Sequence, residues 1–145
     1  MTKEEILEYN KMCMELLEIV PGYFPDELHS TREGSISLCV YANALYYMEK
    51  EDNPECTVYD FLKFDYDWNY IHEVITEVEK LKYLVIIQSN YCCIQTIRNS
   101  DNKFKSYIIA QEHGVHEGKT NTMEAKRNAV VRALYLFLKW YKQNK

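Results

Sequence analysis

Long apolar runs are missing from this 145-residue sequence. No stretch approaches the roughly 18 uninterrupted apolar residues that a membrane-spanning helix requires. An export signal is also missing, because glutamates stand in the first turn where a signal peptide carries lysines, and no small-residue cleavage site follows. Internal repeats, low-complexity tracts and flexible linkers are absent as well. From these absences we expect no membrane-spanning helix and no export, and we expect a single domain, residues 1–145, in the cytoplasm.

The cysteines lack the spacing of a metal site. The chain has five, an odd number, and two of them are adjacent. On a β-strand neighbouring side chains point to opposite faces, so this pair is not expected to hold one metal ion. We predict no metal and no cofactor, and we expect small buried thiols in a reduced compartment. The five are Cys13, Cys39, Cys56, Cys92 and Cys93.

Signatures of catalysis are missing too. Nothing resembles a nucleophile elbow or a Cys/His pair, so no catalytic residue and no enzymatic activity are predicted. The stretch GVHEGKT, residues 114–120, approaches a phosphate-binding loop. It has three residues between its glycines where that loop has four, and Glu117 would place a negative charge beside the phosphates. We expect no nucleotide hydrolysis here, and a weaker anion site at Lys119 and Thr120 stays open.

Apolar residues are plentiful by contrast, at 47%, with 14% aromatic residues. A chain of this length and composition has enough apolar area to offset the entropy of ordering. Apolar residues at helical spacing predict a first helix over residues 1–22, which Pro21 and Gly22 stop. Residues 23–66 have a weak pattern and are expected to be an irregular acidic segment, in which short strands or one helix stay open.

Over the last 79 residues the spacing of the apolar residues changes twice, from helical to strand-like and back. Asp67 is expected to cap a helix with one apolar face, and three β-rich runs follow, separated by turns near Ser89 and over residues 98–103. A final helix is expected after Asn121 or Thr122, with Glu124 completing a capping box if Asn121 is the cap. Its predicted buried stripe is Val130, Ala133, Leu134, Phe137 and Tyr141. The predicted class is α+β: a helix, three-stranded antiparallel meander and helix sandwich over residues 67–145, with the N-terminal helix added.

Several segments resemble small phage and prophage proteins akin to the phage ABA-sandwich domain family. The resemblance rests on MTKEEILEYNK, DYDWNYIHEVITEVEKL, the two strands after it, and EAKRNAVVRALYLFLKWYKQNK. It implies a helix, sheet and helix sandwich and an origin in a virus or mobile element. It implies no activity.

Charge is divided unevenly along the chain. Residues 49–79 hold ten acidic and two basic residues, and residues 98–145 hold four acidic and ten basic ones. The basic residues of the last helix spread over more than half of its circumference, and the whole chain carries a net charge of −5, so direct nucleic-acid binding is not expected.

The stretch TVYDFLKFDYDWNY mixes aromatic rings with carboxylates, a pattern typical of a protein-binding surface. The predicted partner contacts are Glu55, Tyr59, Asp60, Asp65 and Tyr66. Our hypothesis is a non-enzymatic phage accessory protein of the host cytoplasm that binds a basic host protein and inhibits a defence nuclease. The alternative is a small nucleotide-binding or nucleotide-sequestering module that uses the 113–120 loop and the basic last helix.

Overall fold

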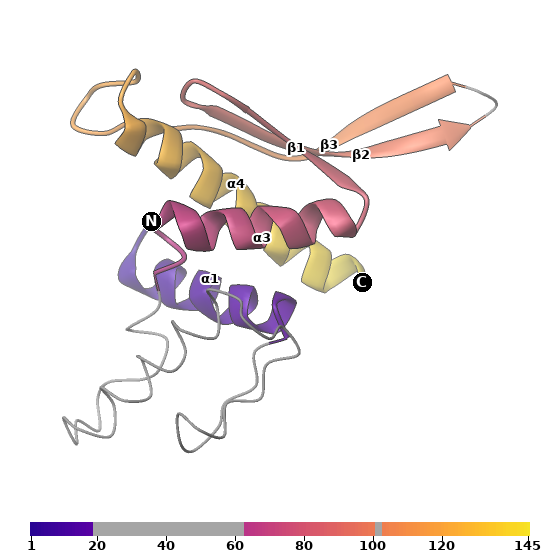
Figure 1. The fold of residues 1–145 in the computed structure, drawn as a ribbon, viewed down its shortest axis with the longest axis horizontal. Helices are drawn as coiled ribbons and strands as arrows, with labels where there is room; N and C mark the ends of the chain where they lie inside the picture. The colour runs from indigo at the N-terminus through magenta and orange to yellow at the C-terminus, as the bar shows by residue number, and fades with distance from the viewer. Residues whose placement is uncertain (19–62, 101–102) are drawn as a thin grey trace, which may run out of the picture. The chain divides into compact units, whose positions relative to one another are not determined.

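The computed structural model describes residues 1–18, 63–100 and 103–145. The elements in them are α1 (Lys3–Leu16), α3 (Trp68–Lys80), β1 (Tyr83–Gln88), β2 (Tyr91–Ser100), β3 (Lys103–His113) and α4 (Met123–Asn144) (Figure 1). The strands form one antiparallel sheet in the order β1-β2-β3, which confirms the predicted α+β class and meander. The chain divides into two compact units, Met1–Val74 and Ile75–Lys145, with the boundary inside α3.

Helix α1 starts at a capping box and ends earlier than predicted. The Thr2 hydroxyl accepts a hydrogen bond from the Glu5 N–H at 3.1 Å, and the Glu5 carboxylate accepts one from the Thr2 N–H at 2.7 Å. The predicted helix over 1–22 is wrong at its end, because α1 stops at Leu16 and Glu18 adopts a left-handed φ of 55°. A residue in that conformation ends a helix without proline or glycine. The buried side of α1 consists of Tyr9, Asn10, Met12, Cys13 and Met14.

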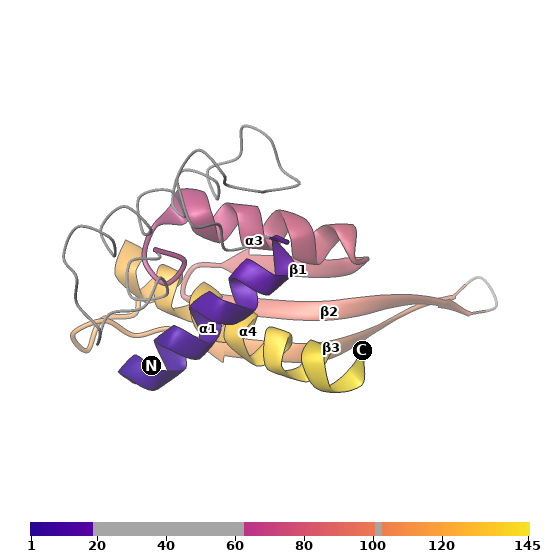
Figure 2. The same cartoon turned by 90° about the horizontal axis from the view of Figure 1, so that it is seen from below.

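The sheet extends further than the sequence predicted. Ser89, with φ of 51°, lies in the predicted turn between β1 and β2. The turn predicted over residues 98–103 is too long, since β2 continues to Ser100, β3 begins at Lys103, and Arg98 pairs with Lys105, while residues 101–102 lie outside the described residues. Polar side chains do not stop a strand pair, because the pairing hydrogen bonds come from the backbone. Strand β1 pairs only with residues 91–96, so β2 and β3 continue as a two-stranded hairpin beyond it (Figure 2).

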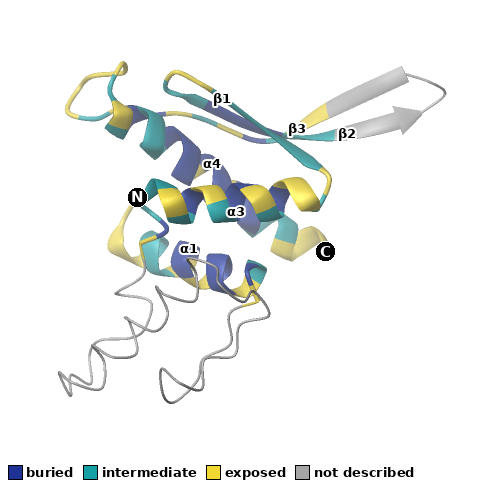
Figure 3. Ribbon diagram, viewed as in Figure 1, coloured by how far each residue is buried: buried dark blue, intermediate teal, exposed yellow. Residues whose placement is uncertain are grey.

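In the second unit, α4 contacts strands β2 and β3. Figures 1 and 2 show the helix lying across one face of the sheet. The predicted stripe is buried except for Tyr141, which is half-buried, and the buried surface is wider than one stripe (Figure 3). The additional buried residues of α4 are Ala125, Ala129, Val131, Tyr135 and Leu138.

Thr122 is the residue that caps α4. Its hydroxyl accepts a hydrogen bond from the Ala125 N–H at 3.1 Å, so the alternative with Asn121 as cap and Glu124 in a capping box is wrong. Asp67 caps α3 as predicted, because its carboxylate accepts a hydrogen bond from the Asn69 N–H at 2.9 Å. Both helices therefore begin at a side chain that satisfies an amide of the first turn.

Replacing Thr122 by alanine is expected to lower the free energy of unfolding by about 1 kcal/mol, because one first-turn amide loses its partner. Thr122→Ser keeps the hydroxyl and is expected to lose less than half of that. Urea unfolding of the three proteins, followed by circular dichroism, measures both differences. Equal losses in the two variants would show that the hydrogen bond does not stabilise α4.

Candidate functional site

Only one end of the predicted partner-binding segment lies in the described residues. Glu55, Tyr59 and Asp60 fall outside them. Asp65 and Tyr66 belong to a turn just before α3, in which the N–H groups of Tyr66 and Asp67 donate to the Lys63 carbonyl oxygen at 3.3 and 2.9 Å. The structure therefore holds these two predicted residues next to a helix start.

The aromatic rings around this turn separate into buried and exposed ones. Phe64 is fully buried, at 0% exposure, and contacts the Tyr70 ring with centroids 6.0 Å apart. Tyr66, two residues on, is 49% exposed, and Asp65 between them is half-buried. Trp68 is half-buried against the His72 ring. The turn is thus anchored by Phe64 and presents Tyr66 to solvent.

The two compact units carry opposite charge. Met1–Val74 contains sixteen acidic and five basic residues, a net charge of −11, whereas Ile75–Lys145 contains six acidic and twelve basic residues, a net charge of +6. The aromatic turn belongs to the acidic unit. A cationic partner is favoured there, and an anionic partner is favoured by the second unit.

The GVHEGKT loop folds into a miniature hairpin. His116 and Lys119 exchange two backbone hydrogen bonds of 2.9 Å each, and the two residues between them, Glu117 and Gly118, have φ of 50° and 73°. Two central residues with positive φ are the signature of a type I′ turn. The amides of His116 and Lys119 are therefore bonded inside the loop, unlike the amides that surround a phosphate.

The first glycine of this loop has a packing role. Gly114 is buried, and a Cβ built on it would lie 1.7 Å from the Ala125 carbonyl oxygen and 2.7 Å from the Ala129 nitrogen. Its own N–H donates to the Asn90 carbonyl oxygen at 2.7 Å, and the Asn90 side chain donates to its carbonyl oxygen at 2.9 Å. Gly114 thus joins the β1–β2 turn to the first turns of α4.

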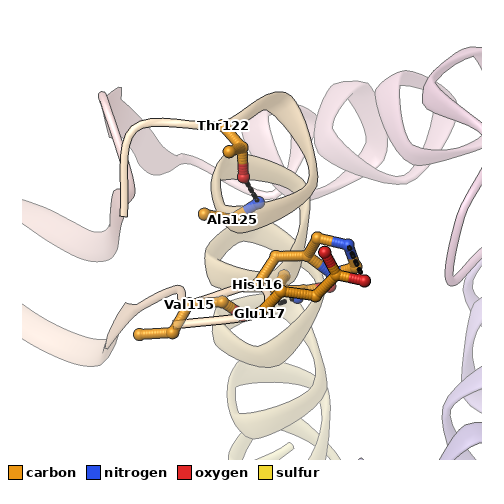
Figure 4. A network of polar contacts seen from close by, with 6 residues as sticks. Val115, His116, Glu117, Thr122 and Ala125 are labelled. Carbon is orange, nitrogen blue, oxygen red and sulfur yellow. Dashed lines mark hydrogen bonds and ion pairs between the residues drawn. The ribbon is translucent and has the colours of Figure 1, made fainter. Parts of the chain in front are cut away.

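Lys119 and Thr120, the predicted anion contacts, are both exposed on this loop. The side chains of His116 and Glu117 approach each other at 4.0 Å, and Figure 4 draws this pair together with the hydrogen bond of the Thr122 cap. The Asn128 amide donates to the Val115 carbonyl oxygen at 3.0 Å, which holds the loop against α4. An anion site at Lys119 and Thr120 therefore stays a prediction, on a loop whose glycines serve turning and packing.

The histidines and cysteines of the described residues do not gather as metal ligands. In ranges 1–18, 63–100 and 103–145, no three His, Cys, Asp or Glu side chains come close enough to share an ion. His113 lies against the Tyr91 ring, with centroids 4.8 Å apart. Cys13, Cys92 and Cys93 are buried free thiols, as the sequence predicted.

Burial also makes two of these thiols poor nucleophiles. Burial, together with the Cys93 group, raises the pKa of the Cys92 thiol to about 12. Burial also raises the pKa of the Cys13 thiol. A hydrogen bond with Tyr9 lowers this pKa and the Asp65 charge raises it, but burial has the largest effect. Both therefore stay protonated at neutral pH, which disfavours thiolate chemistry.

Two basic residues of α4 make polar contacts within the second unit. Arg132 Nε lies 3.9 Å from a Glu112 carboxylate oxygen of β3, and Lys139 Nζ donates to the Tyr135 hydroxyl at 3.2 Å.

One aromatic cluster was not predicted from the sequence. The Tyr83 ring at the start of β1 contacts three rings of α4, with centroid distances of 4.8 to 6.2 Å. The three are Phe137, Trp140 and Tyr141. The available signal was the LKWY ending of the last helix, but the contact depends on which end of the sheet that helix crosses.

In comparisons with known proteins, no family model, no curated protein and no solved structure matched this chain. Each helix within the described part of the chain is too short or too polar to cross a lipid bilayer.

Proposed function

We propose that this chain acts by non-enzymatic protein binding, as an accessory protein of a phage or mobile element. Its acidic aromatic segment, residues 55–70, is the contact surface. The partner is a host protein with a basic surface, and a defence nuclease fits that description because its nucleic-acid channel is positively charged. Occupying such a channel would inhibit the nuclease without chemistry on the part of this chain.

The observation that carries the proposal is the exposed Tyr66 within a unit of net charge −11. A tyrosine ring offers a large contact area with few rotatable bonds, so little entropy is lost when it is held in an interface. Phe64 anchors the turn from the inside, and the capped start of α3 holds its other end. Pre-organised contact residues cost less to bind than flexible ones.

The identity of the partner is tested by charge and salt. Association with a protein recovered from a bacterial host lysate is expected to weaken as salt rises, because the Debye length falls from about 10 Å at 0.1 M to about 3 Å at 1 M. The double variant Glu55→Lys/Asp60→Lys is expected to reduce the affinity by roughly tenfold or more. Tyr66→Ala is expected to cost about thirtyfold, since exposed aromatic anchors dominate interface energy. Calorimetry of the purified pair measures all three.

A matched control exists in the second unit. Glu79→Lys/Glu117→Lys makes the same change in net charge at two exposed residues outside the segment, and is expected to keep the affinity within about twofold. The proposal fails if the two double variants lose equal affinity, or if the segment variant loses none. It also fails if the recovered ligand is a nucleic acid or a free nucleotide, and the alternative of a nucleotide-binding module then takes its place.

A further inference from the structure

The described residues that line a cavity of about 380 Å³ all belong to the Ile75–Lys145 unit. Its floor is a row of three residues that pair directly across the sheet, Tyr83 of β1, Thr96 of β2 and Tyr107 of β3. The remaining lining residues are Leu81, Lys82, Ile109 and Trp140. The volume falls in the range of small-molecule sites, roughly 300 to 1,000 Å³.

The walls of this cavity suit a flat ring. The Tyr83 and Trp140 rings lie 6.0 Å apart between centroids with an interplanar angle of 83°, so two aromatic planes meet almost at a right angle. A planar ligand in such a corner stacks on one ring and meets the edge of the other, which are the two favoured aromatic geometries. Tyr107 is 48% exposed, a large ring left open to solvent at the third side.

The polar groups of the lining suit an anion. Among the described lining residues, Lys82 carries a positive charge, Thr96 and the two tyrosines carry hydroxyl groups, and Trp140 carries an N–H donor. No acidic side chain is among the described residues that line the cavity. The unit as a whole carries a net charge of +6. A ligand rich in acceptors and negative charge satisfies this set.

Two features of the lining are unfavourable for folding alone. The Thr96 hydroxyl oxygen is buried and has no hydrogen-bond partner among the described residues. Lys82 follows the end of α3 with a left-handed φ of 69°, where glycine is the preferred residue. Residues that lower stability in this way are common where a ligand needs them.

We propose that this cavity binds a small planar organic anion, with its ring in the corner of Tyr83 and Trp140 and its charged group at Lys82. The described lining residues and the acidic aromatic segment belong to different units, and this proposal does not rest on the protein partner proposed above.

The probe is indole-3-acetate, compared with neutral indole-3-acetamide and cationic tryptamine, which share its ring. The chain has two tryptophans, so the side-chain N–H signal of Trp140 reports on the cavity and that of Trp68 serves as an internal reference. At millimolar concentration indole-3-acetate is expected to shift the Trp140 signal in an NMR titration and to leave Trp68 unchanged. The amide is expected to bind about tenfold more weakly, and tryptamine more weakly still.

Two variants separate ligand binding from structure. Lys82→Gly removes the charge and relieves the left-handed backbone, so it is expected to melt at the same or a higher temperature while losing the preference for the anion. Thr96→Val removes the unpartnered hydroxyl at constant shape, so it is expected to melt higher while binding indole-3-acetate about tenfold more weakly. The proposal is overturned if Trp140 does not shift, if the three probes bind equally, or if both variants bind as the natural chain does.

Discussion

The Gly114→Ala protein is expected to lose about 3 kcal/mol of unfolding free energy, a large fraction of the roughly 5 to 15 kcal/mol that stabilises a typical domain. The added Cβ would lie 1.7 Å from the Ala125 carbonyl oxygen and 2.8 Å from the Ala125 carbonyl carbon. Both are backbone atoms of α4, so no change of side-chain rotamer relieves the overlap. Either the helix moves away from the loop, or the double hydrogen bond between Gly114 and Asn90 breaks.

Gly118→Ala is the matched control, because it makes the same chemical change four residues away. Nothing lies within 4 Å of a Cβ at that position, and its cost comes only from the left-handed φ of 73°, about 1 kcal/mol. Alanine also restricts the unfolded chain, but this gain is the same in both variants and cancels in the comparison. Chemical denaturation of both proteins measures the difference. Similar losses in the two would contradict a packing role for Gly114.

Element types could be predicted from the sequence because they depend on local periodicity. The helix that Asp67 caps and the three β-rich runs after it show a period near 3.6 followed by a period near 2, and neighbouring residues suffice to recognise both. Boundaries were less accurate. The helix that was predicted to reach Gly22 stops at Leu16, because Glu18 takes a left-handed conformation that glutamate seldom adopts.

Contacts between residues far apart in the sequence could not be predicted from local sequence patterns. The row formed by Tyr83, Thr96 and Tyr107 depends on strand register, which the hydrophobic pattern and the turns set together. A turn over residues 98–103 would have shortened both β2 and β3, so the full length of their pairing could not be predicted. The packing role of Gly114 could not be predicted, because only the three-dimensional approach of α4 shows why a side chain is excluded there.

The same limit applies to the candidate sites. Composition indicated the acidic aromatic segment, since charge and ring content are local properties, and the described part of it includes one buried and one exposed ring. The cavity beside Trp140 is assembled from four different elements and the connection before β1, and no single stretch of sequence carries its pattern. Sites of this kind become visible only when strand pairing and helix placement are known.

Phe137→Ala is expected to lower the unfolding free energy by about 3 to 5 kcal/mol, the usual cost of removing a large buried ring. Phe137 is 0% exposed, and its ring makes an edge contact with the Tyr83 ring, with centroids 4.8 Å apart. It also stacks on the Tyr141 ring, with centroids 5.8 Å apart and an interplanar angle of 18°. Removing it deletes these contacts and leaves a cavity between α4 and β1 that the surrounding backbone fills only in part. Aromatic pairing adds to the loss beyond the buried area.

The neighbouring residue supplies the control, because Leu136 is 41% exposed on the same helix turn. Leu136→Ala is expected to change the unfolding free energy by no more than about 0.5 kcal/mol, as exposed substitutions usually do. Phe137→Leu keeps much of the volume but loses the ring contacts, so it should fall between the two. Guanidinium unfolding of the four proteins tests this order, and a Phe137→Ala loss below that of Phe137→Leu would contradict the central place of this ring in the core of the second unit.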